Sequence, residues 1–291
     1  MLLLLRPLVT LAWIAGCGAR SHLEMDGGVD VRDGRDASLP VVRDGGAEGG
    51  SDAGADGGPD SGSDGGSDAG ADAGSDCAPG RDADRPDGLV SWYRGEGDGS
   101  DSAGGNEGNL EGGVAFTCSR GGLGQAFDFT GGGSDVLIPN TPDLVPAQVT
   151  LVAWIRPARS NAYLGLVTTE PTGGTNSNGY GLRQRRDVEG NTFAFNVGEE
   201  GDGRAFPRAT TSIVPGDWYH VAGTYDGTTA RIFVNGELEG SVVNTLTIDT
   251  TFPLIIGRLN SGSEPFDGAL DEVAVYDRAL SGEEIQALYE E

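Results

Sequence analysis

Hydrophobic residues from about Leu89 onward occur in short runs separated by turn residues, and the runs have the lengths of β-strands. The run 149–157 (VTLVAWIRP) is almost unbroken, as in a strand covered on both faces, whereas residues 192–198 alternate. Asn235-Gly236 lies between two such runs and predicts the two-residue loop of a type I′ hairpin. Further strand-like runs span residues 218–227, 252–259 and 269–276. This pattern predicts an all-β fold, a sandwich or jelly roll of two antiparallel sheets.

One short helix is predicted at the C-terminus. Ser281 and Glu284 fit a capping box, and Leu280 with Ile285 fits the hydrophobic staple around it. A helix of about two turns is unstable by itself. We therefore expect it to dock on a sheet.

The last predicted strand, residues 269–276, contains an unexpected charge. Because side chains alternate along a strand, Asp271 is predicted to share a face with Val273 and Val275, and Glu272 to point the other way. An ionised carboxylate in a core is very costly unless it is paired or bound to a metal. The pattern therefore predicts a partner for Asp271, which is an arginine, backbone N–H groups or a cation.

Residues 1–17 (MLLLLRPLVTLAWIAGC) are apolar but shorter than the roughly 20 residues that span a bilayer as a helix. They fit an export signal. The ending IAGC resembles the bacterial lipobox, in which Cys17 would be lipid-modified; the alternative is ordinary secretion, with cleavage after Ala19. We expect an exported lipoprotein of the bacterial outer membrane or cell surface, or else a secreted or periplasmic protein, whose only membrane contact is a lipid anchor.

Residues 18–86 consist mainly of Gly, Asp, Ala and Ser, and Asp recurs at every fourth position from Asp52 to Asp76. Residues 21–88 contain 17 acidic and 5 basic side chains, a net charge of −12. A segment with so little to bury cannot offset its conformational entropy, so we expect a disordered, self-repelling linker. The Ca²⁺-binding β-helix repeat has a nine-residue period with a large apolar residue in each copy, and neither is present.

Residues 87–291 are then expected to form one domain. From Leu89 on, the chain has 28 acidic and 12 basic side chains, a net charge of −16. An acidic surface argues against nucleic acid as a partner, because phosphates need Lys and Arg.

The chain has three cysteines. With Cys17 assigned to the signal, Cys77 and Cys118 remain, and in an exported protein such a pair suggests a disulfide. It would fasten the end of the linker to the domain. Two free thiols are the alternative.

The runs GTYDGTTARIFVNGELEGS and PLIIGRLNSGSEPFDGALDEVAVYDRALSGEEIQAL, together with VTLVAWIRP and PGDWYHVAGTYDG, resemble the LamG-like jelly-roll domain of the concanavalin A-like lectin and glucanase superfamily. The resemblance is collinear from Asp87 to Glu290. It implies a concanavalin A-like sandwich. Such domains occur in sugar-binding, adhesion and sensory proteins and as accessory modules of enzymes, so the resemblance implies a binding role for this chain.

The resemblance also implies a calcium site, because in the family the Asp at position 271 commonly helps to hold a structural Ca²⁺. Glu96, Asp101 and Asn106 lie where the resemblance places the other ligands, and Ca²⁺ takes six to eight oxygen ligands. This chain has Arg94 where the family often has a first carboxylate. The alternative is that Asp271 is satisfied by hydrogen bonds and the acidic loop is solvated.

An enzyme is not expected. His220 is the one histidine of the domain and lies in a strand-like run, no G-x-S-x-G elbow is present, and zinc would need His and Cys clusters that are lacking. A retaining glycosidase needs two carboxyl groups ~5–5.5 Å apart on one face, whereas Asp271 and Glu272 are predicted on opposite faces. A glycosidase or polysaccharide lyase is therefore the weakest alternative.

Sugar binding would use aromatic side chains beside polar groups. Tyr163 and Tyr180 flank the Gly-, Thr- and Asn-rich loop 170–178 and are the candidates for exposed rings. We expect a monomer that binds carbohydrate or an extracellular protein surface. The alternative is a structural or adhesive envelope protein without a small ligand.

Overall fold

The computed structural model describes residues 77–80, 84–130, 133–160, 162–169, 178–187, 190–198, 203–259 and 265–291. The chain divides into two units, Met1–Gly65 and Gly66–Glu291, and all described residues belong to the second. The predicted signal, Cys17 and nearly all of the linker 18–86 therefore lie outside the described residues. Among the helices that the structure describes, none is both long and apolar enough to cross a membrane.

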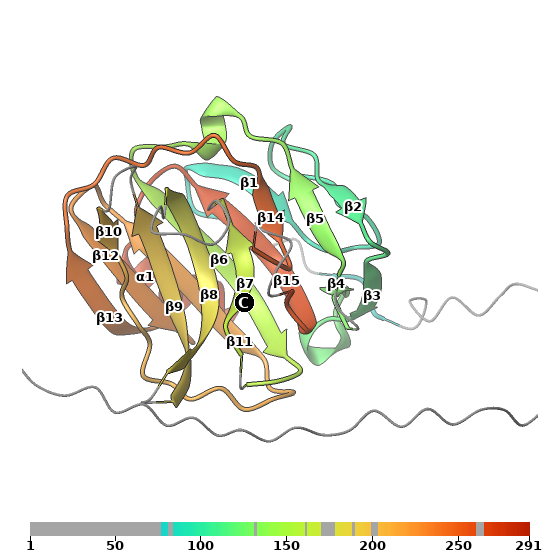
Figure 1. The fold of residues 1–291 in the computed structure, drawn as a ribbon. Coiled ribbons are helices and arrows are strands. Elements are labelled where there is room, and N and C mark those ends of the chain that lie inside the picture. The colour runs from blue at the N-terminus through green and yellow to red at the C-terminus, as the bar shows by residue number, and fades with distance from the viewer. Residues whose placement is uncertain are drawn as a thin grey trace, which may run out of the picture. The chain divides into compact units, whose positions relative to one another are not determined.

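The described residues form two antiparallel sheets that are stacked as two layers (Figure 1). The first sheet contains, in spatial order, β13 (Glu237–Val243), β12 (Thr229–Val234), β11 (Tyr219–Tyr225), β6 (Val149–Pro157), β15 (Gly268–Tyr276), β4 (Gln125–Asp128) and β3 (Ala115–Cys118), and β1 (Leu89–Tyr93) pairs with β15. The second contains β10 (Arg204–Ala205), β9 (Gly190–Gly198), β8 (Gly179–Asp187), β7 (Leu164–Thr168), β14 (Leu254–Ile256), β5 (Asp135–Ile138) and β2 (Asn109–Glu111). The predicted all-β jelly-roll sandwich is confirmed.

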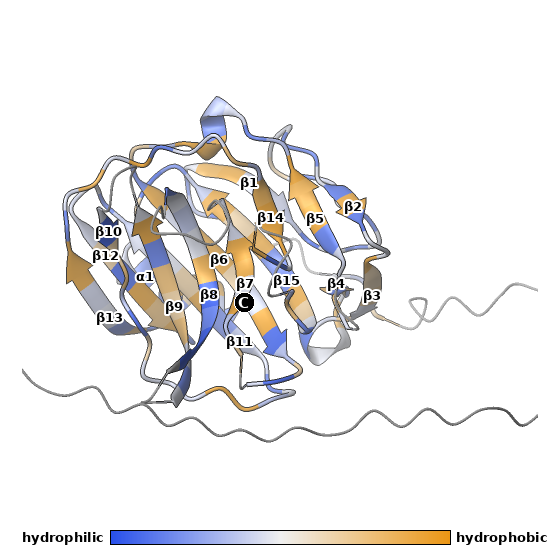
Figure 2. Ribbon diagram, in the orientation of Figure 1, coloured by the Kyte–Doolittle hydropathy of each residue, from blue (hydrophilic) through white to orange (hydrophobic). Residues whose placement is uncertain are grey.

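The main hydrophobic core lies between the two sheets, and Figure 2 shows that hydrophobic residues are concentrated on the strands. In β6, Leu151, Ala153 and Ile155 point into this core. Val152 belongs instead to a second cluster on the outer face of the first sheet. β6 is therefore covered on both faces, as its unbroken apolar sequence predicts.

The predicted hairpin is present between β12 and β13. Asn235 has φ 51° and Gly236 has φ 84°. Two successive positive φ angles are the requirement of a type I′ turn. The turn that the local sequence predicts is therefore present, and Asn235 also contacts β11 by accepting the His220 N–H at 3.0 Å.

The C-terminal helix α1 (Gly282–Glu290) covers the outer face of the first sheet. Its predicted capping box is present, since the Ser281 side chain accepts the Glu284 N–H and the Glu284 side chain accepts the Ser281 N–H. Ile285 and Leu288 pack with Phe233 and other residues of the second cluster. Two short 3₁₀ helices complete the described elements, η1 (Arg120–Gly122) and η2 (Pro142–Leu144).

Replacing the cap, Ser281→Ala, is expected to lower the free energy of unfolding by about 1 kcal/mol, because the Glu284 N–H loses its acceptor. Urea unfolding followed by circular dichroism measures the change. Ser241→Ala, at an exposed position of β13, is the control and should change stability by less than about 0.5 kcal/mol. Equal effects of the two substitutions would contradict a capping role.

Candidate functional site

Strand β15 contains a β-bulge at Asp271 and Glu272. Asp271 pairs with Trp154 of β6 and Ala274 pairs with Val152, so β15 has one residue more than β6 across this interval. Glu272 adopts a positive φ of 52°. The extra residue shifts the alternation of side chains that follows it.

The bulge places Asp271 on the outer face of the first sheet, beside its cross-strand partner Trp154. Leu270 and Val273 both point into the core between the sheets, although they are three residues apart. The prediction that Asp271 shares a face with Val273 and Val275 is therefore wrong. Strict alternation fails because β15 changes its partner strand here. On the side away from β6, β15 pairs with β4 up to Leu270 and with β1 from Val273, and neither strand pairs with Asp271 or Glu272.

A cavity of about 330 Å³ lies over the bulge, and we call it the bulge cavity. Both carboxyl groups line it, so the prediction that Asp271 and Glu272 point to opposite faces is also wrong. The remaining lining comes from the chain around the disulfide, from η1, from β6 and from the end of α1: Gly80, Arg85, Ser119, Arg120, Gly121, Leu123, Trp154, Leu288 and Glu291.

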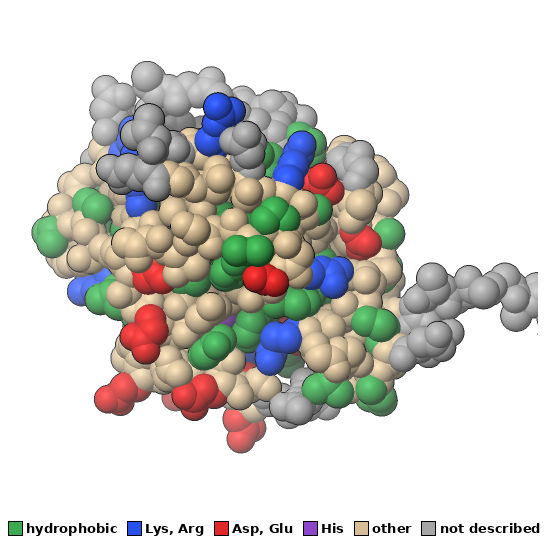
Figure 3. Space-filling model, turned by 90° about the horizontal axis from the view of Figure 1, so that it is seen from below, with side chains coloured by type: hydrophobic (Ala, Val, Ile, Leu, Met, Phe, Trp, Pro, Cys, Tyr) green, Lys and Arg blue, Asp and Glu red, His purple; other side chains and the backbone are tan. Residues whose placement is uncertain are grey.

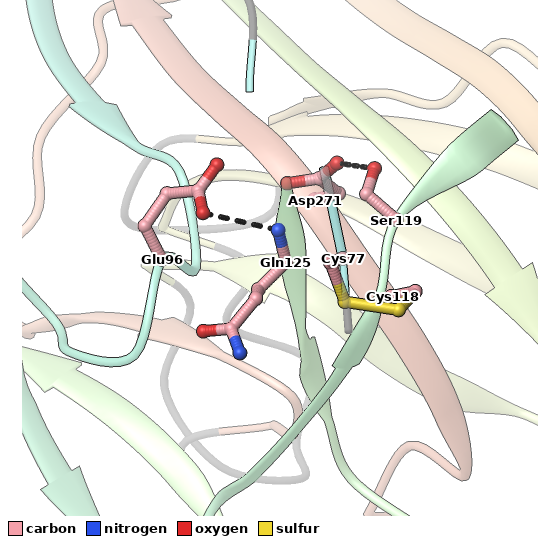
Figure 4. Close-up of a disulfide and its surroundings, with 6 residues drawn as sticks. All are labelled: Cys77, Glu96, Cys118, Ser119, Gln125 and Asp271. Carbon is pink, nitrogen blue, oxygen red and sulfur yellow. Dashed lines mark hydrogen bonds between the residues drawn. A yellow bond between two sulfur atoms is a disulfide. The ribbon is translucent and has the colours of Figure 1, made fainter. Parts of the chain in front are cut away.

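The Asp271 side chain is almost completely buried. It accepts a hydrogen bond from the Ser119 hydroxyl, as Figure 4 shows, and another from the Glu272 N–H at 2.8 Å. Burial, and secondarily the Glu272 charge, raise the pKa of Asp271 to about 8. The carboxyl group is therefore protonated at neutral pH. Of the three partners that the sequence left open, it has a backbone N–H group, and the Ser119 hydroxyl is an additional partner.

Glu272 is held by cations at the edge of the same cavity. It forms an ion pair with Arg85, accepts a hydrogen bond from the Trp92 indole N–H at 2.6 Å, and lies 3.9 Å from the Arg94 guanidinium. Burial raises the pKa of Glu272, and the Arg85 charge counteracts part of this rise. Arg85 also pairs with Glu291 at 3.3 Å. The end of the linker is thus joined to the first strand, the last strand and the C-terminus.

The predicted disulfide between Cys77 and Cys118 is confirmed, with the two Cα atoms 5.5 Å apart (Figure 4). Ala78 extends this attachment, because its N–H donates to Gly122 O at 2.9 Å and its carbonyl accepts from the Gly124 N–H at 2.6 Å. The chain is therefore attached to the domain at residues 77 and 78, and the predicted domain boundary at residue 87 stays a prediction.

The four predicted calcium ligands fall into two pairs: Asp101 contacts Asn106, and the Glu96 charge acts on Asp271. Asp101 accepts N–H groups from Trp92 at 2.8 Å and Asn106 at 3.1 Å, which closes the loop after β1. Glu96 accepts the Gln125 N–H at 3.0 Å (Figure 4). In the described part of the chain, no group of three or more His, Cys, Asp or Glu side chains is placed to hold a metal ion. Calcium binding by Glu96, Asp101, Asn106 and Asp271 stays a prediction.

Tyr180 lies on the inner face of β8 and is fully buried, and its hydroxyl donates to Leu144 O at 3.0 Å. The expectation that it is an exposed ring is wrong. The sequence stretch GYGL looked like a loop border, but β8 begins at Gly179, and alternation then sends Tyr180 inward together with Leu182.

Tyr163 fits its prediction better. It is half-buried just before β7, its hydroxyl accepts a hydrogen bond from Arg183, and the Arg183 and Arg185 guanidinium groups lie 5.4 and 5.1 Å from its ring centroid. Arg183 and Arg185 alternate with the core-facing Leu182 of β8, so they and Tyr163 lie on the outer face of the second sheet.

A second ring continues this surface. Phe206 is half-buried after β10, and three guanidinium groups surround its ring: Arg185 at 4.7 Å, Arg208 at 5.8 Å and Arg204 at 5.9 Å. We call the set of Tyr163, Phe206, Arg183, Arg185, Arg204 and Arg208 the arginine–aromatic face. The arginines of this face were not among the predicted site residues, although the alternation in LRQR (residues 182–185) was an available signal.

The family model for the concanavalin A-like lectin/glucanases superfamily matches residues 130–286, more than half of the chain. The chain belongs to the concanavalin A-like lectin/glucanase superfamily. This lectin/glucanase domain has no significant match among curated proteins.

Solved structures share the fold of this lectin/glucanase domain. Domain 4 of AbnA, a GH43 extracellular arabinanase from Geobacillus stearothermophilus in complex with arabinotriose, has a TM-score of 0.57 and 21% identity, over 69% of this chain and 98% of that chain. The binding domain of Paraclostridial Mosquitocidal Protein 1 has a TM-score of 0.56 and 20% identity, over 70% and 52%. The binding domain of Botulinum Neurotoxin DC in complex with SialylT has a TM-score of 0.53 and 13% identity, over 70% and 51%. The chain therefore spans about half the length of the toxin structures.

The single histidine of the lectin/glucanase domain is part of the packing. His220 is buried beside Trp154, with ring centroids 5.2 Å apart, and Tyr289 of α1 lies 6.0 Å away. Burial lowers the pKa of His220 to about 3, and the Arg120 charge adds to this. The imidazole is therefore neutral at physiological pH and is enclosed between the sheet and the helix.

Proposed function

We propose that this protein is a non-catalytic carbohydrate-binding lipoprotein of the cell envelope. The superfamily is shared by lectins and glucanases, and one structure with the same fold was solved with arabinotriose and another with SialylT. The observation that carries the proposal is the arginine–aromatic face, where two half-exposed rings lie among guanidinium groups on the outside of a sheet.

The chemistry of this face suits a sugar. Aromatic rings offer flat apolar surface for the C–H groups of a pyranose, and a small number of polar groups then fixes its orientation. Guanidinium groups supply several N–H donors in one plane for hydroxyl oxygens. Arg185 lies over both Tyr163 and Phe206, so the two rings and their donors are continuous.

The contacts in the bulge cavity favour a binding role over a hydrolytic one. Asp271 and Glu272 share a cavity, so their faces no longer argue against a glycosidase. Each carboxyl group is nevertheless engaged within the protein: Asp271 by Ser119 and a backbone N–H, and Glu272 by Arg85 and Trp92. Release of reducing sugar from a polysaccharide by the purified protein would contradict the proposed lack of catalysis.

The envelope location rests on the sequence of the export signal and linker. A lipid on Cys17 would hold the protein at the membrane, and the acidic linker would keep the domain away from the membrane surface. We expect the protein to be a monomer there. Cys17→Ser is expected to move the protein from the membrane fraction to the soluble fraction. A variant that stays with the membrane would count against the anchor.

The test of sugar binding is a glycan array probed with the full-length protein, followed by titration of the best glycan against variants. Tyr163→Ala and Phe206→Ala are each expected to weaken binding about threefold to tenfold, because each removes one stacking ring. Trp218→Ala is the matched control, since Trp218 is also half-buried under an arginine, Arg156 at 5.1 Å, but lies next to β11 of the first sheet.

A protein that binds no glycan but adheres to protein-coated surfaces would support the structural or adhesive alternative. Equal loss of binding in the Trp218→Ala control and the two face variants would place the sugar elsewhere on the molecule. Either result would contradict the assignment of binding to this face.

A further inference from the structure

We infer that the arginine–aromatic face recognises a uronic acid-containing polysaccharide, an inference that rests on the proposed carbohydrate-binding function. The chain has 19 basic residues and none of them is a lysine, so every cationic side chain is a guanidinium group. Four of the described arginines meet on this one face, around two rings. A carboxylated sugar is the ligand that would use both the guanidinium groups and the aromatic rings.

Guanidinium groups and carboxylates match in shape as well as charge. The planar fork of arginine can donate two parallel N–H bonds to one carboxylate, which a lysine ammonium cannot do. A guanidinium group stacked on an aromatic ring is held in a fixed plane. Arg185 contacts both Tyr163 and Phe206 and therefore links the two rings of the face, whereas Arg183 is buried against Tyr163.

The face differs from the other arginine sites of the domain in bringing four guanidinium groups around two rings. Three arginines elsewhere form close ion pairs: Arg278 with Glu284 at 2.5 Å, Arg258 with Asp135 at 2.6 Å and Arg231 with Asp226 at 2.7 Å. Arg120 and Arg156 each lie over a single tryptophan ring, that of Trp154 at 3.9 Å and that of Trp218 at 5.1 Å. Arg204 is exposed, and with the described residues it forms no ion pair and only stacks on Phe206. Figure 3 shows arginines at the upper edge and in the lower half of the molecule, with acidic side chains among them and several more at the lower edge.

The net field of the protein does not favour a polyanion. The whole chain has a net charge of −26, and five of its acidic residues lie at positions 187–189 and 199–202, between Arg185 and Arg204 in the sequence. Long-range steering would therefore slow the approach of an acidic polymer. We conclude that selectivity for a uronate must come from directional contacts at short range, and that lysine should not substitute for arginine there.

The experiment titrates the full-length protein with polygalacturonate, with neutral dextran and with dextran sulfate, at fixed ionic strength. Polygalacturonate is expected to bind at least about tenfold more tightly than dextran. Arg185→Ala is expected to weaken polygalacturonate binding at least about tenfold, and Arg185→Lys to restore less than half of that loss on a logarithmic scale. Arg156→Ala, which removes an arginine over a ring of the first sheet, should change it less than twofold.

The outcomes separate this inference from the proposed function. The protein could bind dextran or another neutral glycan tightly, with binding weakened by Phe206→Ala but not by Arg185→Ala. This result would support sugar binding at the face and would overturn the inference that its ligand contains a uronic acid. Dextran sulfate that binds more tightly than polygalacturonate, or full rescue by Arg185→Lys, would show a general anion surface and would also overturn it. No binding to any glycan would overturn both. Arg204→Gln provides the same comparison at an exposed side chain if Arg185→Ala does not fold.

Discussion

Replacing Asp271 with Asn is expected to stabilise the protein at pH 7 and to remove most of the loss of stability between about pH 4 and pH 8. The Asp271 carboxyl group has a pKa of about 8 in the fold, mainly because of burial, against its ordinary value of 3.8. Between these values the folded state holds a proton that the unfolded state has released, so the free energy of unfolding falls as pH rises. The total fall attributable to this group is roughly 3–5 kcal/mol.

Asparagine is the appropriate replacement because it is neutral at every pH. Its amide oxygen can accept the Glu272 N–H, and its NH₂ group can donate to the Ser119 hydroxyl oxygen, which reverses the direction of the hydrogen bond that Ser119 donates to Asp271. Urea unfolding at a series of pH values, with a chelator present, measures the difference between wild type and variant. The difference isolates Asp271 from Glu272 and Glu291, the pKa values of which are also raised, chiefly by burial.

The control for Asp271 is an exposed carboxylate with the opposite shift. Hydrogen bonds from Ser100 lower the pKa of Asp98, so Asp98→Asn should leave the curve unchanged above pH 5. A wild-type curve that is parallel to the Asp271→Asn curve from pH 4 to 8 would show that Asp271 is ionised in the fold. Added calcium should flatten the wild-type curve if the predicted ion binds at Asp271, and no response to calcium would contradict that ligand.

Removing Arg85 is expected to be among the most damaging changes to stability. Arg85→Ala should lower the free energy of unfolding by about 3 kcal/mol, because it leaves Glu272 largely buried without its main counter-charge. The loss includes the contact with Glu291 and the packing of the guanidinium group over the Trp92 ring, 4.3 Å from its centroid. Urea unfolding at pH 7 measures the change.

The matched control is an arginine in a less buried ion pair. Arg278 pairs with Glu284, and each side chain is 33% exposed, against 12% for Arg85. Arg278→Ala should therefore cost less than about 1 kcal/mol. Removing both charges, with Arg85→Met and Glu272→Gln together, should recover much of the Arg85→Ala loss. Equal costs for the two single arginine variants, or no recovery in the double variant, would contradict a buried charge network.

Local sequence signals predicted those parts of the fold that depend on near neighbours. The Asn235-Gly236 turn and the Ser281–Glu284 capping box are both present as predicted, because each is closed by atoms within a few residues. The apolar run 149–157 correctly predicted the buried strand β6, because a strand with apolar residues on both faces is stable only when both faces are covered. The Cys77–Cys118 pair followed from the number of cysteines in a chain expected to be exported.

The candidate site was less accessible to sequence reasoning. Tyr163 was found, but Tyr180 was assigned to the surface because the start of β8 could not be seen beside a polar loop. Phe206 and its arginines are distributed over residues 183–208, and only the pairing of β8, β9 and β10 brings them together. Such a surface depends on contacts between residues that are far apart in the sequence, and a local sequence pattern cannot predict these contacts.

The sequence by itself determined the sandwich, its turn, its helix cap and its covalent link. Only the tertiary structure decided where the acidic pair at Asp271 and Glu272 points. β15 passes from one neighbouring strand to another at this place, and one extra residue between the two pairings reverses the alternation of every side chain beyond it. The physical reason is that the face of a strand residue depends on its register with partners distant in sequence.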